Sequence, residues 1–305
     1  MKFVRLGAFL FALTGFAANQ PAREMLSPAI IAGGLRVPEF SHGYVIVYQP
    51  ESGPANSFTA FAPDGRLAFS KTIEVPGGTH VSLSTVDFDA EGNSAVAANA
   101  LGAAGYLHSL LLFDAAGRQT GFVDTGRYVP LDVAIAPDHS IWTMGWMRGT
   151  GNPVMEDGQE YMVVRQFAPD GRQMGGFLPR YAFPARAEPA ASPRIQVTKD
   201  RVGVLIGSGK SGNDKEWVEL DLRGNAIDRV RFENDSGIIR IALTEDDHVY
   251  LQAHGYGDLF MLDRAAHAWK PVPNQASALV GADGNRLVYR KSGSGPMLLQ
   301  WFDQP

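Results

Sequence analysis

The sequence predicts an all-β chain, a six-bladed β-propeller of four-stranded antiparallel blades. Apolar, β-favouring runs are separated by Asp/Gly turns along nearly the whole chain. Four of these turns end in Gly65, Gly117, Gly171 and Gly224, so the intervals between them are 52, 54 and 53 residues. Each interval has room for four short strands, and four-stranded units repeating at this length are typical of propeller blades.

The composition agrees with an ordered β protein. Of the 305 residues, 45% are apolar, and the 34 Gly and 19 Pro stand between apolar runs instead of clustering. The chain has no cysteine, which excludes disulfides, thiolate nucleophiles and Cys-bound zinc.

The N-terminal segment has the layout of a secretory signal peptide. Lys2 and Arg5 precede a continuous apolar run over residues 6–13, and the small residues Gly15 and Ala17 follow. We expect residues 1–20 to be a signal peptide, residues 21–305 to form one propeller domain, and the protein to be periplasmic or secreted. A buried N-terminal helix or strand is the alternative. The run is too short for a membrane span, which needs about 20 apolar residues.

The charge of the chain argues against two classes of partner. Its formal net charge is −5, and loss of the two N-terminal cations would make it −7. Nucleic acids and anionic membranes require a basic surface, so neither is expected as a partner. We expect a monomer that binds an unknown protein or a polar or anionic small ligand.

The strands are expected in the following order. The first unit has strands at 44–49, 57–62 and 67–73, the second at 83–88, 93–99, 106–113 and 118–124, and the third at 131–136, 141–147, 161–167 and 173–178. The fourth has 194–197, 202–207, 216–221 and 226–232, the fifth 238–243, 248–253, 258–262 and 268–272, and the sixth 277–280, 286–290 and 297–302.

The sixth unit lacks its outer strand, whereas residues 29–37 form an unpaired β-favouring run near the N-terminus. We expect this run to complete the sixth blade. Such closure would remove the open edges that otherwise pair with other chains.

Several turns resemble the turn-and-strand motif of NHL-repeat propellers. The matching stretches are Phe88-Asp89-Ala90-Glu91-Gly92-Asn93, Ala282-Asp283-Gly284-Asn285 and Thr244-Glu245-Asp246-Asp247-His248-Val249-Tyr250. The resemblance covers about residues 40–305 and implies a six-bladed propeller, but no particular function. In the fourth and fifth units Lys199-Asp200-Arg201 and Arg264-Ala265-Ala266 replace the glycine turn.

The alternation of strand direction divides the loops between two faces. All the tight Asp/Gly turns fall on one face, and the other receives the loops at 50–56, 74–80, 99–105, 148–160, 179–193, 208–214 and 291–296. Loops longer than a minimal turn commonly carry binding residues on a rigid scaffold. We therefore expect the site on the long-loop face, near the central channel.

The residues expected at that entrance share a position in or beside the long loops. They are His80, Arg127, Tyr128, Arg148, Arg180, Tyr181, Lys210, His254 and Lys291. The Arg and Lys side chains among them suit an anionic or polar ligand, such as a carboxylate or a saccharide. The alternative is that they are ordinary solvated loop charges.

The sequence contains no recognised catalytic or metal-binding motif. The seven His show no His-x-His or His-Glu-x-x-His spacing, and no Gly-x-Ser-x-Gly elbow is present, so no metal or cofactor is expected. His139 and His248 are interpreted as turn residues. The acidic stretch at 156–160 lacks the alternating oxygen ligands of a calcium loop. No Glu-Gly-Pro opening matches the gluconolactonase-like propellers, so none of their cation ligands is assigned to this chain.

Trp142 and Trp146 lie four residues apart on one predicted strand and so face the same side. Both are interpreted as inter-blade core, together with Phe88, Phe113 and Phe167, with Trp146 as an alternative stacking platform for a sugar. The resulting hypothesis is an exported binding module that uses its long-loop face and has no catalysis of its own. The alternative is a hydrolase or lyase of a lactone or saccharide, with polar residues from several blades at the channel mouth.

Overall fold

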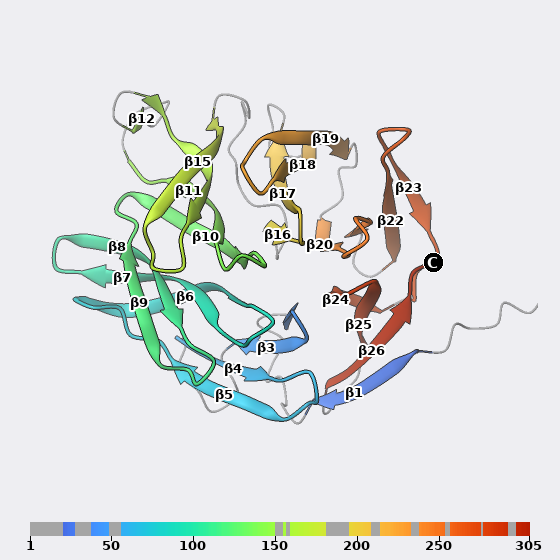
Figure 1. Cartoon of the computed structure of the whole chain (residues 1–305), viewed down its shortest axis with the longest axis horizontal. Coiled ribbons are helices and arrows are strands. Elements are labelled where there is room, and N and C mark those ends of the chain that lie inside the picture. The colour runs from blue at the N-terminus through green and yellow to red at the C-terminus, as the bar shows by residue number, and fades with distance from the viewer. Residues whose placement is uncertain are drawn as a thin grey trace, which may run out of the picture.

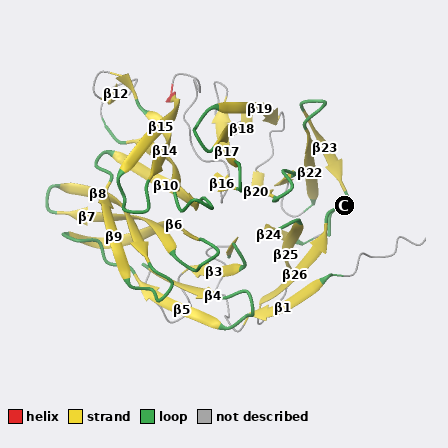
Figure 2. Cartoon of the chain, in the orientation of Figure 1, coloured by secondary structure: helices red, strands yellow, loops and turns green. Residues whose placement is uncertain are grey.

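The structure is a computed structural model that describes residues 21–27, 38–48, 56–149, 155–156, 159–180, 195–208, 214–232, 238–253, 257–275, 277–291 and 297–305. Figure 1 shows six antiparallel sheets arranged around a central axis, which confirms the predicted six-bladed propeller. The described residues are almost entirely strands and loops (Figure 2). They include no helix with the length and apolarity needed to cross a membrane. The predicted signal peptide lies outside the described residues and stays a prediction.

Each blade runs from an inner strand beside the channel to an outer strand at the rim. The first three are β2 (Glu39–Ser41), β3 (Tyr44–Tyr48), β4 (Ser57–Phe61) and β5 (Leu67–Thr72); β6 (Gly78–Phe88), β7 (Ser94–Gly102), β8 (Gly105–Phe113) and β9 (Gln119–Asp124); and β10 (Tyr128–Ile135), β11 (Ile141–Met147), β14 (Met162–Phe167) and β15 (Gln173–Pro179). A small hairpin, β12 (Met155–Glu156) with β13 (Gln159–Glu160), lies within the predicted 148–160 loop.

The other three blades follow the same order. They are β16 (Ile195–Val197), β17 (Arg201–Ser208), β18 (Asp214–Asp221) and β19 (Ala226–Phe232); β20 (Ile238–Leu243), β21 (Val249–Ala253), β22 (Asp258–Asp263) and β23 (Ala268–Val272); and β24 (Ala278–Asp283), β25 (Arg286–Lys291), β26 (Met297–Asp303) and β1 (Arg23–Ser27).

The ring is closed by an N-terminal strand, as predicted, but the strand is β1 and the expectation for residues 29–37 is wrong. β1 pairs antiparallel with β26, from Arg23 opposite Trp301 to Ser27 opposite Met297. Met25 is buried in the core cluster with Leu299 and Trp301. An outer strand touches the core on one side only, so β1 carries a single buried apolar side chain and gives no apolar run to recognise. Residues 29–37 themselves lie outside the described residues.

The inner strand of the first blade has no apolar pattern that would predict it, because its polar residues are buried. Glu39 and Ser41 on β2 are both largely inaccessible to solvent. The turn to β3 is His42-Gly43, with φ of 44° and 84°. Two consecutive positive φ values are typical of the type I′ turn that suits the twist of a two-residue hairpin.

The four regularly spaced glycines occupy equivalent turns between the third and fourth strands of their blades. Gly65, Gly117, Gly171 and Gly224 have φ of 83°, 72°, 88° and 85°. In each hairpin the register shifts by one residue just before the turn. A left-handed glycine followed by such a bulge is a common three-residue hairpin loop, so the repeated spacing reflects one repeated turn.

One of these glycines gives a testable prediction with a matched control. A Cβ at Gly224 would overlap the ring of Phe177 on the neighbouring blade, whereas a Cβ at Gly284, where φ is 57°, would meet nothing within 4 Å. We expect Gly284→Ala to cost about 1 kcal/mol for the positive φ alone, and Gly224→Ala to cost about 2–4 kcal/mol because the ring must also move. Urea denaturation measures both; equal losses would contradict this account.

Glutamine side chains link the fourth blade to the fifth and the fifth blade to the sixth. The amide of Gln196 on β16 donates to the carbonyl of Ile241 on β20 and accepts from the backbone N–H of Leu243. Gln252 on β21 makes the same pair of bonds to Ser277 and Leu279 of the sixth blade, at 2.8 Å each. Inner strands have no neighbouring strand on the channel side, and these side chains satisfy backbone groups that would otherwise lack partners.

The aromatic core follows the prediction except at Trp146. Trp142, Phe88, Phe113 and Phe167 are buried, whereas Trp146 is 40% exposed, so the core interpretation of Trp146 is wrong. β14 pairs with β11 only from Ile141 to Met144. Trp146 therefore lies beyond the stretch of β11 that pairs with β14, and its ring is partly exposed.

Candidate functional site

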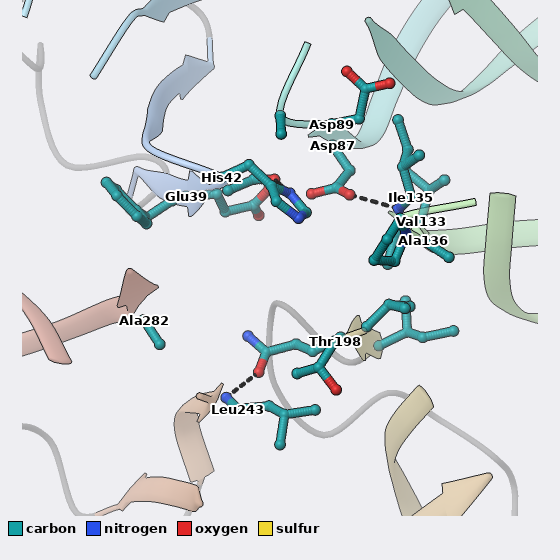
Figure 3. A pocket seen from close by; sticks show the side chains of 18 of the residues that line it. Glu39, His42, Asp87, Asp89, Val133, Ile135, Ala136, Thr198, Leu243 and Ala282 are labelled. Carbon is teal, nitrogen blue, oxygen red and sulfur yellow. Dashed lines mark hydrogen bonds between the residues drawn. The ribbon is translucent and has the colours of Figure 1, made fainter. Parts of the chain in front are cut away.

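The inner strands enclose a cavity of about 530 Å³ in the central channel, at the end where the first-to-second-strand turns meet (Figure 3). All six blades contribute to its wall. It includes the ends of β2, β6, β10, β16, β20 and β24, and the turns that follow them. This volume lies within the range of small-molecule sites, about 300–1,000 Å³.

The wall of this cavity is strongly acidic. Lys199 is the one Lys or Arg side chain among its described lining residues, and seven acidic residues line it: Glu39, Asp87, Asp89, Glu91, Asp132, Glu245 and Asp283. Two carboxylates at the outer rim already have partners. Asp89 lies 3.1 Å from His139 Nδ1, and Asp283 accepts a bond of 2.8 Å from Trp301 Nε1.

Two of the deeper carboxylates, Glu39 and Asp132, are nearly fully buried and bonded within the protein. Glu39 accepts from the hydroxyls of Tyr48 and Thr85. Asp132 accepts from the backbone N–H of Val133 and, across to the next blade, from that of Ile195 at 3.3 Å. Both acids therefore contribute negative charge and hold adjacent blades together.

Asp87 is the deep carboxylate that is partly exposed to the cavity. Its Oδ2 accepts a hydrogen bond of 2.7 Å from the N–H of Ile135, as Figure 3 shows. Burial raises the pKa of Asp87 to about 6, although the nearby His42 and a hydrogen bond from Ser41 lower it; the charge of Asp132 adds to the rise. The carboxyl group therefore changes charge close to neutral pH, which is a common property of functional groups.

This pKa predicts how stability depends on pH. A carboxyl whose pKa is raised on folding destabilises the folded state above that pKa, and the cost disappears as pH falls from about 6 toward its ordinary value of 3.8. We expect Asp87→Asn to stabilise the protein by roughly 1–3 kcal/mol at pH 8 and to change little at pH 4. Urea denaturation at both pH values measures this, and equal stability of the variant and the parent at pH 8 would contradict the raised pKa.

Three residues at the rim have donor atoms suited to a divalent metal. Ligand atoms of Asp89, Glu91 and His139 lie within 4.8 Å of one another. Asp89 also accepts from the backbone and side chain of Asn93, at 2.8 Å each. His139, with φ of 63°, is a turn residue as predicted. The contact between Asp89 and His139 also links the second and third blades.

The structure brings two of the expected long-loop residues together and buries a third. Arg127 and Arg148 are joined, since the N–H of Arg148 donates to the Arg127 carbonyl and Arg127 Nε donates to the Arg148 carbonyl. The Arg148 guanidinium lies 3.8 Å from the ring centre of Tyr106, which is not among the residues expected from the sequence. Tyr128 is fully buried, and its hydroxyl donates to the Val163 carbonyl.

The other expected residues are dispersed. His80, with φ of 50°, borders a separate recess beside the β5–β6 loop. Arg180 lies at the end of β15 and Lys291 is exposed at the end of β25. Lys210, Tyr181 and His254 lie outside the described residues. Four polar residues meet in the channel: Glu39, His42, Asp87 and Asp132. The sequence gives no signal for this group, because its members are single polar residues from separate strands and a turn and converge only when the ring closes.

Comparisons with known proteins agree on the fold. No family model matches the chain, and no curated protein matches it. The PQQ-bound aldose sugar dehydrogenase of Streptomyces coelicolor aligns over 93% of this chain and 99% of its own, at 14% identity and a TM-score of 0.52. Virginiamycin B lyase from Staphylococcus aureus aligns over 92% and 98%, at 11% identity and 0.48, and a luciferin-regenerating enzyme over 90% and 94%, at 10% and 0.48. At 14% identity and this TM-score, the likeness to the dehydrogenase shows the fold alone.

Proposed function

We propose that this chain is an exported ligand-binding module whose central channel receives a small polar molecule. The observation that carries the proposal is the enclosed cavity in which Asp87 presents a partly exposed carboxylate. A rigid ring of six blades fixes the position of this group, so little ordering is required when a ligand binds. The NHL-like turns are consistent with such a scaffold role.

The test is a binding screen by thermal shift with a panel of small amines, sugars and carboxylates. We expect the stabilising compounds to lose their effect on Asp87→Asn and to keep it on Asp170→Asn. Asp170 is a matched control, because it is an exposed turn residue of the third blade and does not line the cavity. Compounds that stabilise both variants equally would show that the channel is not their binding site.

The long-loop face is a second candidate position for the same function. Its support is the Arg148 guanidinium, which lies over Tyr106 and has no hydrogen bond or ion pair from its side chain to any described residue. We expect alanine replacement of Arg127, Arg148 and His254 together to weaken binding of anionic compounds if this face is used. If the triple variant binds anionic compounds as tightly as the parent does, the long-loop face is not the binding site.

A hydrolase or lyase is the alternative function, and the proximity of His42 and Asp87 favours it. A carboxyl group that changes charge near neutral pH and an imidazole can act as general acid and base when they face one cavity. A panel of lactones and saccharides tests this reading. Turnover that is lost in both His42→Ala and Asp87→Asn would support it, and turnover that survives in both would exclude these residues.

Export is tested by the mature N-terminus. We expect mass spectrometry of the protein expressed with its full leader to find a chain that begins close to residue 20. An uncleaved chain that starts at Met1 would contradict the signal peptide.

A further inference from the structure

We infer that the channel ligand is an alkyl amine, with its ammonium group against Asp87 and its methylene chain along the apolar wall of the cavity. The inference rests on the proposed channel site and specifies the class of molecule that it takes. Three features carry it: the sign of the charge in the wall, the availability of one carboxylate, and the apolar surface beside that carboxylate.

The charge of the wall selects a cation. Seven carboxylates line the cavity against one lysine, and no Arg or Lys side chain of the described residues pairs with Asp87. Arg240 of β20 is buried on an inner strand, but it does not line the cavity. An anionic or neutral molecule would leave this field uncompensated, whereas a cation reduces the repulsion between Asp87 and Asp132.

The available donor atoms favour an ammonium over a metal ion. Glu39 and Asp132 are 4% and 1% exposed and their oxygens bond within the protein. Oδ2 of Asp87 already accepts from Ile135. Ca²⁺ requires six to eight oxygen ligands, and this set of oxygens does not converge to supply them. An ammonium group has three donors and binds well to one carboxylate with hydroxyl or carbonyl neighbours.

The neighbouring wall is suited to an alkyl chain. Figure 3 shows Val133, Ile135, Ala136, Leu243 and Ala282 around the same space as Asp87 and His42. Each buried methylene contributes about 0.8 kcal/mol in favour of binding. An aliphatic amine therefore satisfies both the charged and the apolar parts of the wall.

The groups around Asp87 also predict the pH dependence of binding. They are His42 from the β2–β3 turn, Glu39 from β2, Asp132 from β10 and Lys199 after β16, while the β20 and β24 sides contribute Glu245 and Asp283. An ammonium binds ionised Asp87 better than the neutral acid, so binding releases a proton. Protonation of Asp87 therefore weakens binding as the pH falls.

The test is isothermal titration calorimetry of the intact protein with butane-1,4-diamine, and with butane-1,4-diol as a neutral molecule of the same length. We expect the diamine and not the diol to bind at pH 7.5, with affinity at least tenfold lower at pH 5. Asp87→Asn should weaken binding at least tenfold, while Asp170→Asn should match the parent. Titration in buffers of different ionisation enthalpy should show proton release at pH 6.

The outcomes separate the amine assignment from the channel site. No heat with the diamine, or equal binding of the diol, overturns the amine assignment. If another compound of the screening panel then binds in a manner that depends on Asp87, the channel site stands with a different ligand. Binding of CaCl₂ or MgCl₂ alone that is lost in Asp87→Asn would replace the amine with a metal ion. Diamine binding of equal affinity in Asp87→Asn and the parent overturns the channel site itself.

Discussion

Replacement of Glu219 by alanine is expected to lower the free energy of unfolding by about 3–5 kcal/mol, the typical cost of removing one partner from a buried ion pair. Glu219 on β18 is fully buried. Its carboxylate accepts two bonds from Arg264, at 2.6 and 2.7 Å, one from Arg201 at 2.9 Å and one from Trp217 Nε1 at 2.7 Å. Without the carboxylate, two guanidinium groups between the fourth and fifth blades lose their common partner.

The pKa of Glu219 gives the same effect a pH dependence. Burial alone would raise this pKa, but hydrogen bonds from Arg264 and Trp217 outweigh burial and hold the pKa below its ordinary value. A carboxyl group whose pKa is lowered on folding stabilises the folded state at every pH above its ordinary pKa. This stabilisation is lost as the pH falls through the lowered pKa. The difference between Glu219→Ala and the parent should therefore be largest at neutral pH and shrink in acid.

Asp303→Ala is the control for Glu219→Ala, because Asp303 pairs with Arg286 in an exposed ion pair on the sixth blade. Exposed pairs contribute little, so the urea midpoint should not move measurably. Comparable losses in the two variants at pH 7 would show that burial is not what makes the Glu219 network strong.

Removal of β1 is expected to have the largest effect of all, loss of the stable monomer. A chain that begins at Ser27 lacks four of the five residues that pair with β26, including the buried Met25. β26 then becomes an open edge, and an open, apolar edge strand pairs readily with other chains. We expect a much lower unfolding temperature together with dimers or aggregates in size-exclusion chromatography.

A chain that begins at Pro21 keeps β1 and controls for removal of the leader alone. It should be monomeric and as stable as the longer chain. A peptide of residues 21–28, added to the chain that begins at Ser27, should restore part of its stability by filling the empty position beside β26. A monomeric, stable chain without β1 would show that the ring does not depend on this strand for closure.

The strands and turns that repeat could be predicted, because their signals are local. Gly117 and its equivalents adopt positive φ in a turn of fixed chemistry, and the apolar alternation on either side predicts strands whatever the rest of the chain does. Two turns without glycine, Lys199-Asp200-Arg201 in the fourth unit and Arg264-Ala265-Ala266 in the fifth, have a structural role that the sequence does not show. Arg201 and Arg264 both bind Glu219, so these two turns contribute to one long-range ion-pair network.

The candidate site could not be predicted in the same way. Asp87 lies two residues before a turn aspartate and resembles any other polar strand residue in sequence. Burial raises its pKa and the charge of Asp132 on another blade adds to the rise, while Ser41 and His42 of the first blade lower it. Arg127 and Arg148 were expected at a site and do lie together, but the ring of Tyr106 that supports Arg148 comes from the neighbouring blade.

The number of blades, the order of most strands and the end of the disc at which each turn lies could be predicted from sequence, because strand period and turn chemistry act over a few residues. Only the folded ring shows which N-terminal strand closes it, which charges are buried, and which carboxylates meet in the channel. Those properties depend on burial and on the electrostatic field of residues brought together from separate blades, and neither exists until the ring has closed.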